Sequence, residues 1–231
     1  MATKKTIFDA ITSGDAGRVK RFLSRDPEAL GDRDEDGLSP VLRALYAGKP
    51  EIVELLLARQ PELDVFEAAA LGEADALRRL VGRSKRRAGA FSHDGFTPLH
   101  LASYFGHAEA AKLLLEKGAD VHARSMNRLL FSIMPLHSAA ASRQTELAEL
   151  LLDHGADPNA TQDGGWTALH AAAANGNAEL VRLLLARGAN PRQQSDDRTP
   201  PIEFAIEKRH HDVVVLLQGG RRRRRVLAPR A

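Results

Sequence analysis

A short turn motif returns four times along this 231-residue chain and constrains its fold more than any other feature. The four copies span Ser39–Leu42, Thr97–His100, Met134–His137 and Thr167–His170. Each is followed by small apolar residues and then by a leucine-rich run, and three of these runs end at a Gly-Ala pair. Self-similarity at a period of a few tens of residues predicts a stack of small units that bury their apolar faces against one another. Such a stack offers a surface rather than a catalytic pocket.

The fullest copy of the repeat lies in residues 91–124. In order, it contains Asp-Gly-x-Thr-Pro-Leu-His from Asp94, Leu-Ala at Leu101, Gly-His at Gly106, three leucines from Leu113 and Gly-Ala-Asp from Gly118. This order resembles the ankyrin repeat, and the resemblance covers about residues 5–218. It implies an all-α solenoid of helix-turn-helix units with β-turn fingers, which binds another protein and has no chemistry of its own.

The repeats can be aligned with one another by counting from the position of Thr97, which we call slot zero. Equivalent positions in seven expected units are Lys5, Ser39, Leu63, Thr97, Met134, Thr167 and Pro200. Their separations are 34, 24, 34, 37, 33 and 33 residues. The value of 24 means that unit three lacks the turn before its first helix, which predicts a kink or a looser junction near residues 60–63. The value of 37 places extra residues in an apolar turn finger, residues 125–133. The first and last units read as polar caps.

Each unit is expected to be a pair of short helices. Hydroxyl side chains and prolines at slot zero and one suit the start of the first helix. Leucines and valines at helical spacing form the second helix, and glycine ends it. Because helices this short are marginal alone, stacking must supply the order. Aspartate in place of Leu114 or Leu184 is therefore expected to unfold the array.

The resemblance implies that partners bind a concave face built from turn fingers and the ends of the first helices. Candidate partner-binding residues at these positions are Tyr46, Phe96, Tyr104, Phe105, Leu130, Phe131, Ile133, Trp166 and Asn175. Both tyrosines and the only tryptophan of the chain belong to this set, and these residue types are enriched at interface hot spots. For Phe96 and Trp166 the competing interpretation is packing on the adjacent turn. Tyr104 and Phe105 are the preferred candidates.

Histidines recur at slot three, as His100, His137 and His170. Stacking spaces them along a ladder, so they do not converge on one metal ion, and the resemblance implies that they hydrogen-bond neighbouring turns. We expect His210 and His211 to be solvated cap surface. The chain has no cysteine, no phosphate-binding loop and no hydrolase motif. The sequence thus predicts no enzyme activity, no cofactor and no metal.

The C-terminal residues 219–231 contain six arginines and no acid. Removing these six positive charges from the net charge of +3 leaves the array at −3. The block Arg221, Arg222, Arg223, Arg224 and Arg225 predicts a disordered tail. Binding of nucleic acid or another polyanion by this tail, with steep salt dependence, is the alternative function, and self-assembly is a third. The sequence has no apolar run long enough to span a membrane, so we expect a cytoplasmic protein. We also expect it to be a monomer.

Overall fold

The computed structural model describes residues 6–126 and 132–226. These residues form fourteen α-helices and three 3₁₀ helices, with no strand among them. The α-helices pair as α1 (Ile7–Ser13) with α2 (Ala16–Arg25), α3 (Pro40–Tyr46) with α4 (Pro50–Leu57), α5 (Val65–Leu71) with α6 (Ala74–Arg83), α7 (Pro98–Phe105) with α8 (Ala108–Glu116), α9 (Pro135–Ala141) with α10 (Thr145–Asp153), α11 (Ala168–Ala174) with α12 (Ala178–Ala186), and α13 (Pro201–Glu207) with α14 (His211–Val226). The 3₁₀ helices are η1 (Pro27–Gly31), η2 (Lys85–Gly89) and η3 (Asp163–Gly165). The predicted all-α solenoid of seven helix pairs is confirmed.

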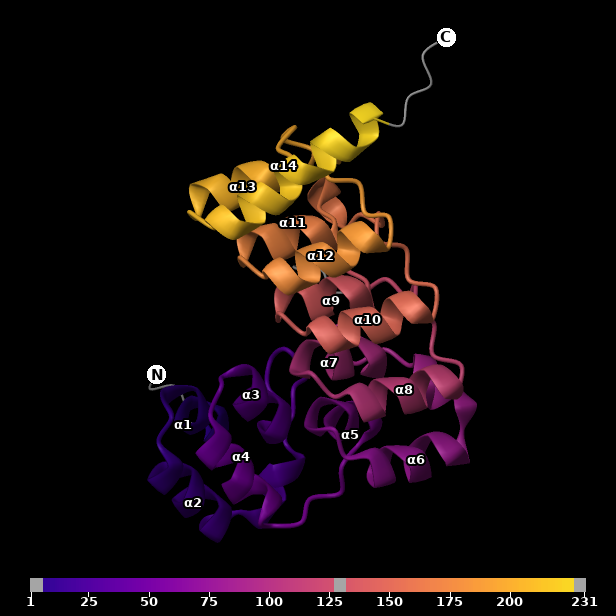
Figure 1. Ribbon diagram of the computed structural model, residues 1–231. Helices are drawn as coiled ribbons and strands as arrows, with labels where there is room; N and C mark the ends of the chain where they lie inside the picture. Colours follow the sequence, from indigo (N-terminus) through magenta and orange to yellow (C-terminus); the bar gives the residue numbers. More distant parts are fainter. Residues whose placement is uncertain (1–5, 127–131, 227–231) are drawn as a thin grey trace.

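The helices stand in two columns (Figure 1). From α5 onward the odd-numbered first helices form one column and the even-numbered second helices form the other. The turn fingers connect one pair to the next. Helices α1 to α4 lie beside this stack, on the side of its first helices.

Helix starts follow the capping chemistry of the sequence. The Ser39 hydroxyl accepts the backbone N–H of Leu42 at 3.2 Å, and Thr97 accepts that of His100 at 3.4 Å. Unit three, which has no turn finger, begins at Asp64 instead of Leu63. The Asp64 carboxylate accepts the N–H groups of Phe66 at 2.9 Å and Glu67 at 2.8 Å. A reciprocal bond from the Asp64 N–H to the Glu67 carboxylate, 2.8 Å long, completes a capping box.

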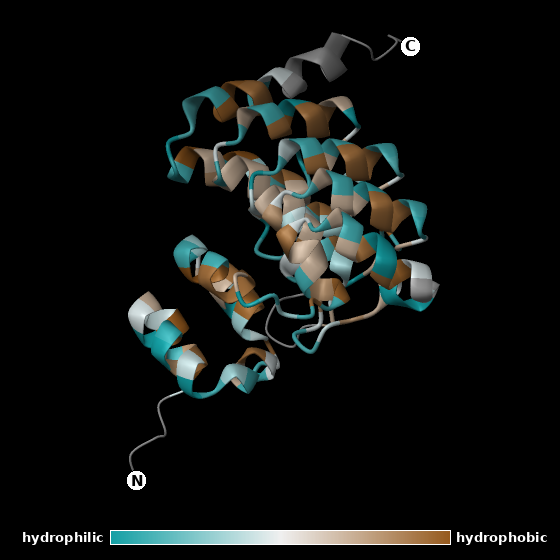
Figure 2. Ribbon diagram, turned by 90° about the horizontal axis from the view of Figure 1, so that it is seen from below, coloured by the Kyte–Doolittle hydropathy of each residue, from teal (hydrophilic) through white to brown (hydrophobic). Residues whose placement is uncertain are grey.

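The buried apolar residues divide between two main clusters. One runs from Ile7 to Leu56 and the other from Val65 to Leu217. A small third cluster of Leu38, Leu42, Ala70, Phe96 and Leu101 joins them. The division falls between α4 and α5, where Gln60 has a positive φ of 52°. In Figure 2 the helices next to the N-terminus stand to one side of the remaining stack. This is the junction at which the sequence predicts a kink.

The C-terminal end differs from the sequence-based expectation. Disorder is expected from Gly219 onward, whereas α14 continues as a helix to Val226. Arginine is a good helix former, and extending an existing helix costs far less than starting one, so the two glycines do not end α14. Within the described residues, no helix has both the length and the apolar character that a membrane span requires.

Candidate functional site

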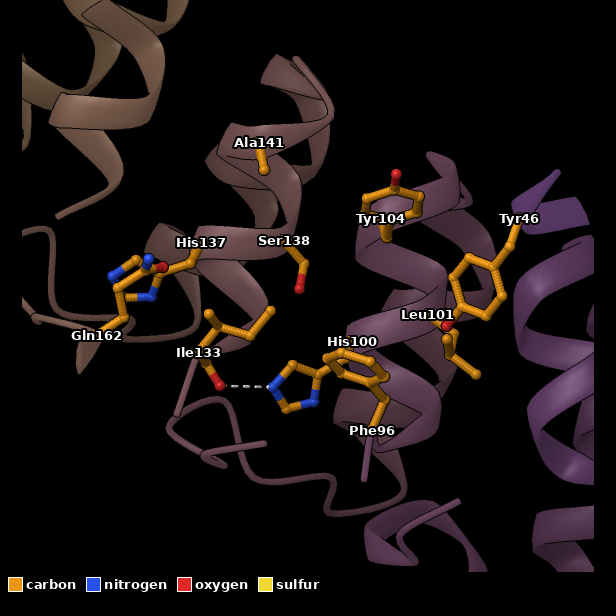
Figure 3. A pocket seen from close by; sticks show the side chains of 10 residues that line it. All are labelled: Tyr46, Phe96, His100, Leu101, Tyr104, Ile133, His137, Ser138, Ala141 and Gln162. Atoms are coloured by element: carbon orange, nitrogen blue, oxygen red, sulfur yellow. Dashed lines mark hydrogen bonds between the residues drawn. The ribbon is translucent and has the colours of Figure 1, made fainter. Parts of the chain in front are cut away.

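A cavity of about 360 Å³ opens among the first helices of units two, four and five (Figure 3). Its walls come from α3, α7 and α9 and from the turns that precede α7, α9 and α11. The lining residues are Tyr46, Phe96, His100, Leu101, Tyr104, Ile133, His137, Ser138, Ala141 and Gln162. Most of this lining is apolar, so the cavity is suited to an apolar side chain of a ligand.

The missing turn finger of unit three brings unit two to this cavity. Without that finger, Gly37 in the second turn lies directly against the ring of His93 in the fourth, with no room for a side chain. The Tyr46 hydroxyl donates to the Asp94 carboxylate at 3.2 Å. Burial, together with this carboxylate, raises the pKa of Tyr46 above its ordinary value. Tyr46 therefore stays neutral and forms one wall of the cavity.

Aromatic rings meet at the mouth of the cavity. The Tyr46 ring lies 6.2 Å from that of Tyr104 and 5.5 Å from that of Phe105, measured between centroids. Tyr104 and Phe105 make an edge-to-face pair at 5.1 Å. Tyr104 is 43% exposed, whereas Tyr46 and Phe105 are half-buried. Of these three rings, Tyr104 is the one most available to a partner.

The slot-three histidines fix the turns that surround the cavity. His100 Nδ1 accepts the Thr97 N–H at 3.3 Å, so its Nε2–H donates to the Ile133 carbonyl at 2.9 Å. His137 and His170 repeat this arrangement, with bonds to the carbonyls of Ala160 at 3.1 Å and Thr199 at 3.2 Å. Burial lowers the pKa of His100 and of His137 to about 4. The implied role of these histidines, which is to tie neighbouring turns by hydrogen bonds, is confirmed.

Two polar groups of the lining have no partner in the part of the chain that the structure describes. The Ser138 residue is only 2% exposed, and its hydroxyl makes no hydrogen bond with a described residue. The side-chain amide of Gln162 is likewise free of described partners. Figure 3 shows the Ser138 hydroxyl directed from α9 into the space in front of α7. A ligand could satisfy both groups.

Four of the nine candidate partner-binding residues line the cavity: Tyr46, Phe96, Tyr104 and Ile133. Trp166 instead packs on Phe204 of the next unit, with ring centroids 4.4 Å apart. The Asn175 side chain donates to the carbonyls of Ala140 at 3.3 Å and Ala141 at 3.0 Å. The neighbouring units thus hold both of these side chains.

The remaining candidate binding residues either do not line the cavity or are not fully described by the structure. Phe105 packs beside the cavity without lining it. Leu130 and Phe131 lie outside the described residues. Arg221–Arg225 belong to α14, of which only the backbone is described there.

The sequence reasoning missed Leu101, Ser138, Ala141 and Gln162 as cavity residues. Leu101 and Ser138 share slot four, which faces the inner side of the first helices. Their common slot was the available signal.

A second ladder of side chains, at slot ten, was also missed. His107 donates to the Ala70 carbonyl at 2.9 Å, and His210 donates to the Ala174 carbonyl at 3.1 Å. The expectation that His210 is solvated cap surface is wrong, because this bond holds the last unit to the sixth. Gln144 lies against Gly106, and Asn177 donates to the Arg143 carbonyl at 3.4 Å. The signal was a polar residue at slot ten, directly after the turn residue at slot nine, which is Gly106, Arg143, Gly176 or Arg209 and has a positive φ. Among the described residues, no cluster of three metal-ligating side chains occurs.

Comparison with known sequences agrees with this geometry. The family described as ankyrin repeats (3 copies) matches residues 7–125 and 136–221. The chain belongs to the ankyrin repeat family. Repeats of this family generally mediate contacts between proteins and typically have no catalytic activity.

Individual relatives are similar over parts of their length. Alpha-latrocrustotoxin-Lt1a of Latrodectus tredecimguttatus is 29% identical over 119 residues, which cover 48% of this chain and 8% of the toxin. The DNA-binding protein RFXANK of Homo sapiens is 31% identical over 135 residues, covering 45% of this chain and 52% of that protein. Palmitoyltransferase akr1 of Aspergillus oryzae is 38% identical over 61 residues, or 26% of this chain and 8% of the enzyme. In each case the match spans less than two thirds of the relative.

Proposed function

We propose that this chain is a non-enzymatic binding module that holds one protein partner on the inner face of its ankyrin stack. The cavity among α3, α7 and α9 is the anchor point of that face. The observation that carries the proposal is this apolar hollow, with the exposed ring of Tyr104 at its mouth.

Interface energetics favour this arrangement. Binding energy concentrates in a few aromatic side chains near well-packed pockets, and the surrounding contacts mainly exclude water. Tyr104 is already held by its edge-to-face contact with Phe105. Ordering a side chain at an interface costs free energy, and a ring that is fixed beforehand avoids part of that cost. Tyr104 is therefore a pre-organised contact.

A pair of matched substitutions tests the proposal. Tyr104→Ala removes the ring at the cavity, and Phe91→Ala removes a ring of similar exposure, 41%, that lies outside the cavity lining. Partners captured from a lysate of the source cells are compared by quantitative mass spectrometry, and melting temperatures are recorded. A specific partner should bind Tyr104→Ala at least about tenfold more weakly and bind Phe91→Ala normally. Equal retention by both variants would count against the inner face.

Polyanion binding through Arg221–Arg225 is a separate prediction. Retention on a heparin column that falls steeply with salt, and disappears when these arginines become alanine, would support it. Retention that survives the substitutions would exclude it.

A further inference from the structure

We propose that the partner fills this cavity with a tyrosine side chain carried on a basic segment. This inference rests on the proposed function and adds the chemistry of the partner. Three independent features of the cavity lead to it: its ring-lined walls, a hydroxyl without a partner among the described residues, and the acidic turn tips on both sides.

The walls suit an aromatic ring. Tyr46, Phe96 and Tyr104 contribute rings, and Leu101 and Ile133 contribute aliphatic surface. Aromatic pairs prefer tilted or edge-to-face contacts, which rings on several sides provide. A volume of about 360 Å³ corresponds to roughly a dozen waters, enough for one large side chain. The space therefore accepts a single aromatic anchor.

The hydroxyl of Ser138 distinguishes tyrosine from other aromatic anchors. A phenylalanine or leucine would cover this hydroxyl and leave it without a hydrogen bond to any described residue, which weakens binding. A phenol both donates and accepts, so it can pair with Ser138 whichever way that hydroxyl turns. Gln162, at the opposite end of the cavity from Tyr46 in Figure 3, can pair with the backbone of the partner.

Exposed carboxylates lie on the turn tips on both sides of the cavity. Glu35 is on the second turn, which contacts the fourth, and Asp163 directly follows the lining residue Gln162. The sixth and seventh turns are joined by a bond of 2.9 Å from the Asp196 N–H to the Gly164 carbonyl. This places Asp196 and Asp197 next to Asp163. None of these carboxylates has an ion pair within the described residues.

The same turns also carry the exposed cations Arg124 and Arg198, which the four carboxylates outnumber. Opposite charge speeds association and selects partners, so lysine or arginine next to the tyrosine fits this row of turns. The arginine-rich C-terminal segment of a second copy could also meet the acidic turns. Residues 219–231 contain no aromatic side chain, however, and would leave the cavity empty. A second copy is therefore an alternative that the experiment separates.

The test uses three labelled synthetic peptides and the full chain. Each peptide carries two basic residues on either side of a central tyrosine, phenylalanine or leucine, and fluorescence anisotropy measures its affinity. We expect the tyrosine peptide to bind about fivefold to tenfold more tightly than the phenylalanine peptide, because one buried hydrogen bond is gained. Ser138→Ala should abolish this difference. Ser103→Ala should preserve it, because that hydroxyl lies on α7, bonds the Leu99 carbonyl at 2.6 Å and does not line the cavity.

The contribution of the acidic turns to binding is tested with a second pair of variants and a matched control. Asp163→Asn combined with Asp197→Asn should weaken all three peptides and reduce the salt dependence of binding. Glu146→Gln combined with Glu179→Gln, on the second helices α10 and α12, should change neither. Peptides with acidic flanks should fail to bind.

Several results would overturn the inference. These are equal affinities for the three peptides, a tyrosine preference that persists in Ser138→Ala, and equal binding of acidic peptides. A chain mass that rises with concentration, and falls when Arg221–Arg225 become alanine, would assign the surface to a second copy instead. If the peptides show no tyrosine preference while Tyr104→Ala still loses its cellular partner, this inference fails and the proposed function stands. If Tyr104→Ala keeps its partner, the proposed function itself fails.

Discussion

The junction between units two and three differs from the other junctions of the stack. At the regular junctions, the side chain at slot ten reaches back to the preceding unit, as those of His107 and His210 do. Lys49 lies against Gly14 in the same way between units one and two. At the irregular junction the equivalent residue, Glu73, is exposed, and no side chain lies against Gly48. Units one and two are held instead by the small cluster that joins Leu38 and Leu42 to Ala70 of unit three, and by Tyr46, which reaches past unit three to Asp94.

This difference shows how a lost turn creates a cavity. Regular stacking places consecutive turns beside one another and leaves a smooth inner face. Here the absent third finger lets the second turn meet the fourth, and Tyr46 bonds Asp94 across the gap. Tyr46 then becomes a wall of the cavity. The irregular junction is therefore the origin of the cavity.

The largest expected effect on stability distinguishes the core that runs from Ile7 to Leu56 from the core that runs from Val65 to Leu217. Leu56 and Leu184 occupy equivalent positions in units two and six, and both are fully buried. Aspartate at either position costs at least about 5 kcal/mol, because a packed side chain is lost and a charge is buried. Leu184→Asp should abolish the cooperative melt followed by circular dichroism. Leu56→Asp should unfold only the region before α5, as judged by hydrogen exchange. Loss of the whole melt in Leu56→Asp would show that the two cores fold as one.

Acid should also destabilise the stack from α7 onward more than the region before α5. All nine histidines lie between His93 and His211, so the region before α5 has none. Burial lowers the pKa of His100 and His137 from 6.5 to about 4. The unfolded chain thus binds their protons first, and stability is complete above pH 6.5 and declines towards pH 4. The loss is on the order of 3 kcal/mol for each of these two histidines.

Hydrogen exchange as a function of pH checks this prediction. Protection of α7 to α13 should fall between pH 6.5 and 4 while protection of α1 to α4 changes less. Glu67, buried at the irregular junction beside Asp64, has a raised pKa. Its contribution to stability therefore increases as the pH falls, opposite to that of the two histidines. Uniform loss of protection along the chain would contradict the prediction.

The sequence predicted the regular part of the molecule well and the irregular part incompletely. Repetition fixed the helix pairs and the histidine ties, because both depend on residues close in sequence or one period apart. The deletion before unit three indicated where regularity breaks. It could not show that Tyr46 would meet Asp94, since that contact joins units two apart and depends on the direction of the bend. Nor could it show that Ser138 would line a cavity shared with Tyr46, since that cavity depends on the same bend.

A smaller effect concerns the link across the irregular junction. Tyr46→Ala removes two ring contacts and the bond to Asp94, which should cost about 2 to 4 kcal/mol. The region before α5 should then move away from the stack, and small-angle X-ray scattering should report a larger radius of gyration. Tyr46→Phe keeps the ring and loses only the hydrogen bond, so about 1 kcal/mol is expected with no change in shape. An unchanged scattering profile for Tyr46→Ala would mean that other contacts hold the junction.

The smallest effect compares one position in two units. His107→Ala removes a bond to the backbone of the preceding unit and should cost about 1 kcal/mol in urea unfolding. Glu73→Ala, at the same slot of unit three, should change stability by less than about 0.5 kcal/mol. Glu73→His carries the comparison one step further. If the slot-ten bond depended only on residue type, this histidine would stabilise the irregular junction. It should not, because its backbone acceptor would be the Tyr46 carbonyl, and no part of unit three approaches Gly48 there. The bend between units two and three, and not the residue type at slot ten, therefore decides whether the ladder of slot-ten hydrogen bonds continues across that junction.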